Sequence, residues 1–398
     1  MRNLLGILFI LTFVVFVGCQ SKYPGVPASY HTLIDSALVK AGENAVQINE
    51  ALEKSSKRQK EAIAFLIAYM PKKDLETLTS EFILDQVNGA VKVREEFEWC
   101  KNLPDSIFLN EVLPYYSLDE ARDNWRENYY TRFSPYVRDC KTIFEAIDSV
   151  NLNIRDELEI DYNTKRSIVN ISPFQAEKEK MATCTGLSFL LVDAFRSVGI
   201  PARIAGTPLW TNMRGNHNWV EVWIDGEWYF TEYYPDTLNK SWFLADAGKA
   251  DPEKPIHWIY AASYKPTGTY FPRVWKRKAK DIHGVNVTDR YIRLYQEQLA
   301  EKELAEDEIL LDVVLYKKPN SKSAENRVSE KVTVWEGDKK VVFGYTPMPT
   351  DDLNKYLVIR LRKNTEYRFE FVDTEGNEKS VPLKFDENSD KILNLTQS

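Results

Sequence analysis

Three residues in the middle of the chain have the types and the order needed for nucleophilic catalysis: Cys184, His217 and Glu232. A cysteine thiolate attacks a carbonyl carbon, an imidazole takes up and returns the proton, and a carboxylate orients the imidazole. A cysteine on a helix is more often a small buried apolar residue, so the interpretation depends on the surrounding elements. Those elements must bring the three side chains together.

The residues after Cys184 predict a helix that begins at the cysteine. Apolar residues recur at helical spacing, as is typical of a helix lying on a core: Leu187, Leu190, Leu191, Ala194, Phe195 and Val198. Gly199 can take the left-handed conformation that ends a helix, and Pro201 prevents its continuation. At the other end, free N–H groups and the helix dipole stabilise an anion and lower the pKa of a thiol. Cys184 is therefore predicted to be the nucleophile.

His217 and Glu232 belong to two β-rich runs on either side of Asp225-Gly226, a dipeptide typical of two-residue hairpin turns. If Ile224 pairs with Glu227, His217 and Glu232 become diagonal neighbours on one face of the sheet. Their backbones are then roughly 7–8 Å apart, within reach of two long side chains. The hairpin therefore predicts that Glu232 can orient His217.

As a set, these motifs resemble the transglutaminase-like superfamily of papain-type thiol enzymes. The similarity covers roughly residues 165–245 and includes Cys184 at a helix start, an apolar run into Gly-Ile-Pro-Ala-Arg, and the motif His-x-Trp-Val-Glu-Val that begins at His217. The family normally has an Asp fifteen positions after the His, and this position is Glu232 here. The replacement keeps the charge and adds one methylene group. The resemblance implies a Cys–His–carboxylate triad on an α+β core.

Two more residues are candidates for the same site. Asp236 has the same strand parity as Glu232 and is the alternative carboxylate, but it follows Pro235, which cannot donate to a strand ladder. Gln175 lies nine residues before Cys184. The papain-type resemblance implies that such a Gln donates to the oxyanion, together with the backbone N–H of the cysteine. The alternative for Gln175 is a solvent-exposed helix residue.

The first residues predict export. Arg2 precedes a largely apolar run over residues 4–17, which is too short for a comfortable membrane span and is typical of a signal peptide. Phe16-Val17-Gly18-Cys19 resembles a bacterial lipobox, in which the cysteine is lipidated and becomes the first mature residue, although Phe16 replaces the usual Leu. We expect a protein lipid-anchored at Cys19 to a bacterial membrane, facing the periplasm or the cell surface. The alternative is an ordinary secretory peptide.

Two of the four cysteines have no role in this scheme, because Cys19 is assigned to the lipid and Cys184 to chemistry. Cys100 and Cys140 either form a disulfide in an oxidising compartment or are two buried free thiols. Neither a zinc-type ligand spacing nor a phosphate-binding glycine loop occurs, so we predict no metal and no cofactor. The net charge of −7 argues against a nucleic-acid partner. Nothing in the sequence indicates an oligomeric state.

The predicted fold class is α+β, in four parts. A signal peptide (1–19) precedes a helical N-terminal region (20–160), a transglutaminase-like core in which the nucleophile helix packs on an antiparallel sheet (161–288), and a linker helix with an antiparallel β-sandwich (289–398). Six short alternating runs separated by turn residues predict the sandwich: 309–316, 328–335, 340–345, 356–362, 367–372 and 381–385. This last part contains no Cys and no His, so we expect no chemistry there.

Together these features predict a cysteine enzyme that transfers an acyl group from an amide. Hydrolysis of a peptide or glycopeptide through a thioester acyl-enzyme is favoured, because water is abundant outside the cell and no motif marks an amine site. One alternative is a protein transamidase with an amine acceptor. Another is an inactive thiol fold that binds a cell-surface polymer, but a binding module would not need the complete set of Cys, His and carboxylate.

Overall fold

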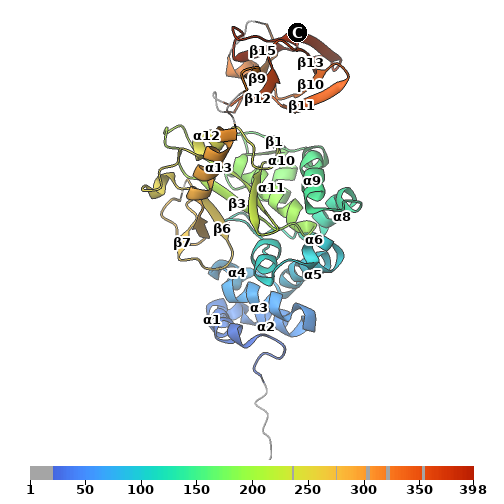
Figure 1. Cartoon of the computed structure of the whole chain (residues 1–398). Coiled ribbons are helices and arrows are strands. Elements are labelled where there is room, and N and C mark those ends of the chain that lie inside the picture. Colours follow the sequence, from blue (N-terminus) through green and yellow to red (C-terminus); the bar gives the residue numbers. More distant parts are fainter. Residues whose placement is uncertain (1–20, 235–236, 275, 302–304, 320–322, 352–354) are drawn as a thin grey trace, which may run out of the picture.

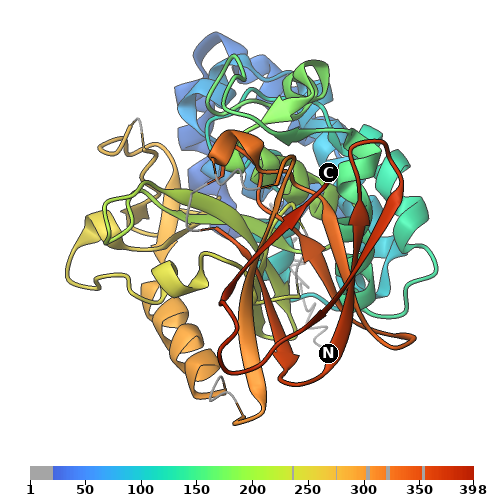
Figure 2. The same cartoon turned by 90° about the horizontal axis from the view of Figure 1, so that it is seen from above.

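The structure is a computed structural model that describes residues 21–234, 237–274, 276–301, 305–319, 323–351 and 355–398. Three parts follow one another along the long axis of the molecule (Figure 1): N-terminal helices, a mixed core and a β domain. Viewed from above, the strands of the β domain lie across the core (Figure 2). The predicted α+β fold class is confirmed. Among the described helices, none has the length and apolar character needed to cross a bilayer.

The N-terminal part consists of helices that pack around a shared apolar centre. They are α1 (His31–Ala41), α2 (Ala45–Lys54), α3 (Lys60–Tyr69), α4 (Lys72–Thr77), α5 (Ser80–Glu96), α6 (Glu98–Lys101), α7 (Asp105–Ile107), α8 (Arg126–Val137) and α9 (Ile143–Leu158), with the π-helical turn η4 (Phe108–Val112). The short 3₁₀ turns of this part are η1 (Ala28–Tyr30), η2 (Gly42–Asn44) and η3 (Lys57–Gln59). Two further 3₁₀ turns lie later in the described chain: η5 (Pro255–His257) in the core and η6 (Ala324–Asn326) in the β domain. Buried residues of these helices and of the core form one continuous cluster. The proposed boundary at residue 160 stays a prediction.

The core is built on a six-stranded antiparallel sheet with the order β5-β4-β3-β6-β8-β7. Its strands are β3 (Ala202–Thr207), β4 (His217–Ile224), β5 (Glu227–Thr231), β6 (Tyr260–Ser263), β7 (Thr269–Tyr270) and β8 (His283–Asn286). A small parallel pair, β1 (Asp161–Tyr162) and β2 (Met181–Ala182), and the helices α10 (Pro173–Glu179), α11 (Cys184–Ser197), α12 (Leu244–Ala247) and α13 (Thr288–Glu301) complete it. The predicted register is confirmed, because Ile224 pairs with Glu227 and Val220 with Thr231.

Helix α11 is the central element of the core. It begins at Cys184, and Gly199 beyond its end has φ +75°, as the sequence predicted. The sequence indicated one apolar stripe, but every residue from Thr185 to Ser197 is buried. The reason is that α11 packs against β3 and β4 as well as against the helices α8 and α9. The helix is therefore enclosed, and only its first residue is partly exposed.

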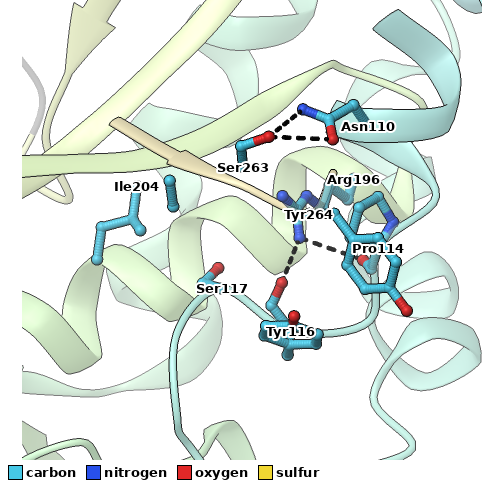
Figure 3. A pocket seen from close by; sticks show the side chains of 9 residues that line it. Asn110, Pro114, Tyr116, Ser117, Arg196, Ile204, Ser263 and Tyr264 are labelled. Carbon is cyan, nitrogen blue, oxygen red and sulfur yellow. Dashed lines mark hydrogen bonds between the residues drawn. The ribbon is translucent and has the colours of Figure 1, made fainter. Parts of the chain in front are cut away.

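A buried arginine anchors the C-terminal end of α11. The guanidinium of Arg196 donates to the carbonyls of Glu111 (3.0 Å), Ala202 (3.0 Å), Pro114 (3.2 Å) and Tyr116 (2.9 Å). Figure 3 shows two of these bonds beside a cavity of about 10 Å³, which is close to the space that one water needs. Since buried carbonyls require donors, this residue connects the nucleophile helix to the preceding helical part.

The C-terminal β domain is a sandwich of a four-stranded and a three-stranded sheet, with the orders β11-β10-β13-β14 and β12-β9-β15. The strands are β9 (Glu308–Tyr316), β10 (Lys331–Glu336), β11 (Lys339–Tyr345), β12 (Leu357–Arg362), β13 (Glu366–Val372), β14 (Glu378–Lys384) and β15 (Ile392–Thr396). Apolar residues of both sheets form one cluster between them. The six predicted strands are present. Strand β15 was missed because it pairs in parallel with the distant β9, a contact that no turn signal announces.

The candidate disulfide between Cys100 and Cys140 is wrong, and the alternative of two free thiols holds. Cys100 is fully buried on α6, where it packs so closely on Gly199 that a Cβ there would lie 2.9 Å from the cysteine Cβ. Cys140 is only partly buried and follows α8, where its Sγ lies 3.8 Å from the carbonyl oxygen of Tyr136. The two thiols thus belong to different packing environments.

Candidate active site

The thiol of Cys184 lies at the N-terminal end of α11, where the chain comes close to its neighbours. A Cβ at Gly186 would lie 2.7 Å from the Ile171 side chain and 2.9 Å from that of Ala182. A glycine is therefore needed for the first turn to approach these two residues. The helix start leaves Cys184 partly exposed, with free N–H groups and the positive end of the dipole beside its sulfur.

His217 and Glu232 meet at the ends of the two hairpin strands. His217 is the first residue of β4, and Glu232 directly follows the last residue of β5. Nε2 of His217 lies 2.6 Å from Oε1 of Glu232, with the side chains 11% and 18% exposed. The hydroxyl of Ser241 donates to the other carboxylate oxygen. Because Nε2 faces the carboxylate, Nδ1 is the ring nitrogen left for the cysteine.

The protonation states of the three groups are coupled. Burial alone would raise the pKa of the Cys184 thiol, but the hydrogen bond to His217 and the attraction of the imidazolium lower it overall. Burial alone would lower the pKa of His217, yet Glu232 and the bond to Cys184 raise it from 6.5 to about 9. Burial would also raise the pKa of Glu232, but His217 holds it below its ordinary value. These directions favour a thiolate–imidazolium pair facing a carboxylate near neutral pH.

Two polar residues beside the triad were not found by the sequence analysis. The backbone N–H of Asn218 and the hydroxyl of Thr185 both donate to the Cys184 thiolate and help to lower its pKa. The Asn218 side chain donates in turn to the Thr185 hydroxyl (2.7 Å), which links β4 to the start of α11. A Cβ at Gly206, opposite Asn218 on β3, would lie 1.9 Å from the amide oxygen of Asn218. Thr185 directly follows Cys184 in the chain, and Asn218 directly follows His217. This adjacency was the only sequence signal for the two residues.

An aromatic shell surrounds the imidazole. The His217 ring centre lies 5.8 Å from that of Trp219, 5.0 Å from that of Trp242 and 5.2 Å from that of Phe243. These rings cover much of the imidazole, and its removal from bulk water strengthens its electrostatic interactions. The indole N–H of Trp242 is buried and has no hydrogen-bond partner among the described residues.

Strand β4 is fixed by a buried polar network under the site. The indole of Trp219 donates to the hydroxyl of Tyr291 (2.6 Å), which donates to the carboxylate of Glu221 (2.8 Å). Arg203 and Arg290 also donate to Glu221. Glu221 is fully buried, and although burial would raise its pKa, the two arginines keep it low. The network therefore holds an ionised carboxylate in the middle of the strand that begins with His217.

One family model matches the part of the chain that contains this site. The family model described as the transglutaminase-like superfamily matches residues 131–233, a range that contains Cys184, His217 and Glu232. Residues 131–233 of this chain are therefore similar to the transglutaminase-like superfamily.

Two solved structures are also similar to the chain. One is a cysteine-protease candidate from Cytophaga hutchinsonii (16% identity, 35% of this chain and 47% of that chain, TM-score 0.27). The other is the transglutaminase of red sea bream (10% identity, 73% of this chain and 66% of that chain, TM-score 0.31). The chain thus spans less than two thirds of each of these proteins. No curated protein matches the sequence.

The remaining candidate residues from the sequence analysis do not join this arrangement. Gln175 is on α10, and its side-chain nitrogen donates to Glu179 (2.6 Å) one turn further on. The amide group that the resemblance assigned to the oxyanion is therefore directed at a carboxylate of its own helix. Asp236, the alternative to Glu232, lies outside the described residues, as does the lipid-anchor candidate Cys19.

Proposed function

We propose that this transglutaminase-like protein is a cysteine hydrolase that cleaves an amide bond of a peptide or glycopeptide. The observation that carries the proposal is the arrangement of His217 between Cys184, whose thiol pKa it lowers, and Glu232, with 2.6 Å between Nε2 of His217 and Oε1 of Glu232. A similarity to the transglutaminase-like superfamily supports a cysteine-dependent enzyme in general. Hydrolysis is the more specific part of the proposal.

The residues define the steps of the reaction. The Cys184 sulfur attacks the carbonyl carbon, and the carbonyl electrons move to the oxygen. When the tetrahedral intermediate collapses, the C–N bond breaks and the imidazolium of His217 gives its proton to the leaving amine. Water then attacks the thioester while His217 takes up its proton. The C–S bond breaks, and Cys184 is released as the thiolate with a carboxylic acid product. Glu232 keeps the imidazole oriented in both halves of the reaction.

The reasons for choosing water over an amine are chemical. An exported enzyme works in an aqueous space where water is by far the most abundant acceptor, and no motif in the sequence marks an amine site. We propose that the protein reaches that space through its N-terminal signal and is held at the membrane by a lipid on Cys19. The substrate would then be a peptide or glycopeptide outside the cytoplasm.

The proposal is tested first by labelling and then by product analysis. One sample each of wild-type protein and Cys184→Ala is treated with a thiol-reactive probe at pH 6, and separate unlabelled samples of both are incubated with peptide and glycopeptide libraries, with and without a small primary amine. Hydrolysis predicts products with a new free carboxyl group, absent with Cys184→Ala. Products that carry the added amine would show that the reaction is transamidation and not hydrolysis. An unlabelled Cys184 together with unchanged libraries would contradict the enzyme proposal and favour a binding module.

A further inference from the structure

A lysine of the C-terminal β domain lies beside the candidate triad. Nζ of Lys355 is 5.6 Å from the ring centre of Trp242 and 5.8 Å from that of Tyr234. Trp242 packs against the His217 ring, and Tyr234 is two positions after Glu232 in the chain. Figure 1 shows the β domain on the side of the core that carries α12 and α13. The domain that has no Cys or His of its own therefore places a cation at the site.

Contacts within the β domain and across to the core hold this lysine in place. Nζ of Lys355 lies 3.1 Å from a carboxylate oxygen of Asp351, with the side chains only 19% and 11% exposed. The same carboxylate oxygen of Asp351 accepts a hydrogen bond from the backbone N–H of Met348 (2.7 Å). The Met348 sulfur in turn accepts from the hydroxyl of Tyr234 in the core (3.8 Å). A chain of contacts thus connects the lysine with the residues that flank Glu232.

The space between the β domain and the core is a cavity of about 500 Å³. Glu232, Ser241 and Trp242 line it from the core, and Met348 and Lys355 line it from the β domain. The β domain is therefore one wall of the space on the carboxylate side of the triad. A cation in this wall attracts the carboxylate, and because the Glu232 and Lys355 side chains are only 18% and 19% exposed, their charges interact more strongly than in bulk water.

We propose that Lys355 is a positioning residue of the triad: it keeps Glu232 ionised and turned toward His217, so that the β domain completes the active site. The inference rests on the proposed function, because it concerns the same three residues. Its electrostatic basis is that Glu232 faces His217, the Ser241 hydroxyl and Lys355. Burial raises the pKa of Glu232, and the attraction of His217 and then of Lys355 lowers it. The charged group that faces Lys355 on its own segment is Asp351.

The sign of the expected effect follows from this arrangement. Without the lysine, Glu232 takes up a proton at a higher pH as the solution is acidified. The imidazolium then loses its partner, and Cys184 returns to the unreactive thiol. The acid limb of Cys184 reactivity should therefore move to higher pH, by roughly half a pH unit for one partly exposed charge.

The experiment measures the rate of Cys184 alkylation by iodoacetamide between pH 4 and 9 in the full-length protein. Four forms are compared: wild type, Lys355→Met, Lys355→Arg and Lys340→Met. Lys340 is a matched control because it also lies over an aromatic ring of the β domain, 5.2 Å from the Phe343 ring centre, but is exposed near the β10–β11 turn. Thermal unfolding of each form is recorded in parallel. If Lys355→Met does not fold, Lys355→Gln takes its place.

The inference predicts that the acid limb of the Cys184 alkylation profile moves to higher pH in Lys355→Met. It should stay near the wild-type position in Lys355→Arg and should not move in Lys340→Met. An unchanged limb in Lys355→Met would overturn it, and so would a lower melting temperature without any shift of the limb. The two proposals fail differently. If wild-type Cys184 is no more reactive at pH 6 than Cys100 and Cys140, the proposed function itself is wrong. If Cys184 is activated but its acid limb is the same in Lys355→Met as in the wild type, only the role of the lysine is wrong.

Discussion

Replacing Glu232 by Gln removes one charge from the triad with little change in shape. The amide oxygen can still accept the hydrogen bond from His217, and Ser241 can still bond to the other end of the group. The substitution therefore isolates the electrostatic effect of the carboxylate on His217. We expect the protein to fold normally and Cys184 to lose its reactivity at acidic pH.

The size of the effect can be estimated from the His217 pKa. Its rise from 6.5 to about 9 corresponds to about 3 kcal/mol in favour of the imidazolium, with Glu232 the largest factor that opposes the effect of burial. If about half of this comes from the carboxylate charge, its loss weakens the thiolate–imidazolium pair about tenfold relative to the neutral thiol and imidazole. At pH 10 the difference should disappear, because the thiol then ionises without help.

The assay follows the alkylation of each cysteine peptide by mass spectrometry in the native protein. Cys100 and Cys140 are internal references, because burial raises the pKa of Cys100 to about 12 and also raises that of Cys140. In the wild type, Cys184 should react well before both at pH 6. In Glu232→Gln, its rate at pH 6 should fall about tenfold toward that of an ordinary thiol.

Two variants decide what a negative result means. Glu227→Gln changes an exposed glutamate at the other end of β5 and should leave the profile unchanged. Asp236→Asn tests the alternative carboxylate from the sequence analysis. If Glu232→Gln behaves like the wild type while Asp236→Asn loses the acidic reactivity, the assignment of Glu232 as the orienting residue is refuted.

Three further predictions concern the helix anchor, the sheet and the terminus. Arg196→Met should lower the free energy of unfolding in urea by about 3 kcal/mol or more, because the carbonyls of Glu111, Ala202 and Tyr116 lose the Arg196 donor and that of Pro114 keeps Arg126, whereas exposed Arg138→Met should change little. Gly206→Ala should slow Cys184 alkylation at pH 6, since the new Cβ would displace Asn218 beside His217; an unchanged rate would contradict the tight approach. Cys19→Ala should move the protein from the membrane to the soluble fraction without changing its melting temperature, and wild-type protein without lipid in mass spectrometry would refute the anchor.

The helix and the hairpin were predictable because their signals are local. The spacing of apolar residues over 187–198 and the glycine at position 199 depend only on neighbours within a few turns. Asp225-Gly226 sets the turn, and the turn sets the register of both strands. Since a register determines which side chains share a face, the pairing of His217 with Glu232 could be derived without any tertiary information.

Features that depend on distant segments were missed or wrongly assigned. Burial of α11 on all sides needs α8 and α9, which lie far from it in sequence, so its one-sided stripe was misleading. Strand β15 is defined by a parallel partner, β9, whose paired residues lie about eighty positions earlier in the chain. Whether two cysteines bond depends on their separation in space, and sequence does not give that separation.

Local patterns in the sequence were therefore enough to place the candidate catalytic groups: a thiol at a helix start, an imidazole at a strand start, and a carboxylate in hairpin register with it. The surroundings of these groups depend on tertiary packing. Ser241, Trp242 and Lys355 reach Glu232 and His217 only because the chain folds back and the β domain lies against the core. Periodicity and turn chemistry are local properties, whereas burial and charge at a site are sums over everything that packs around it.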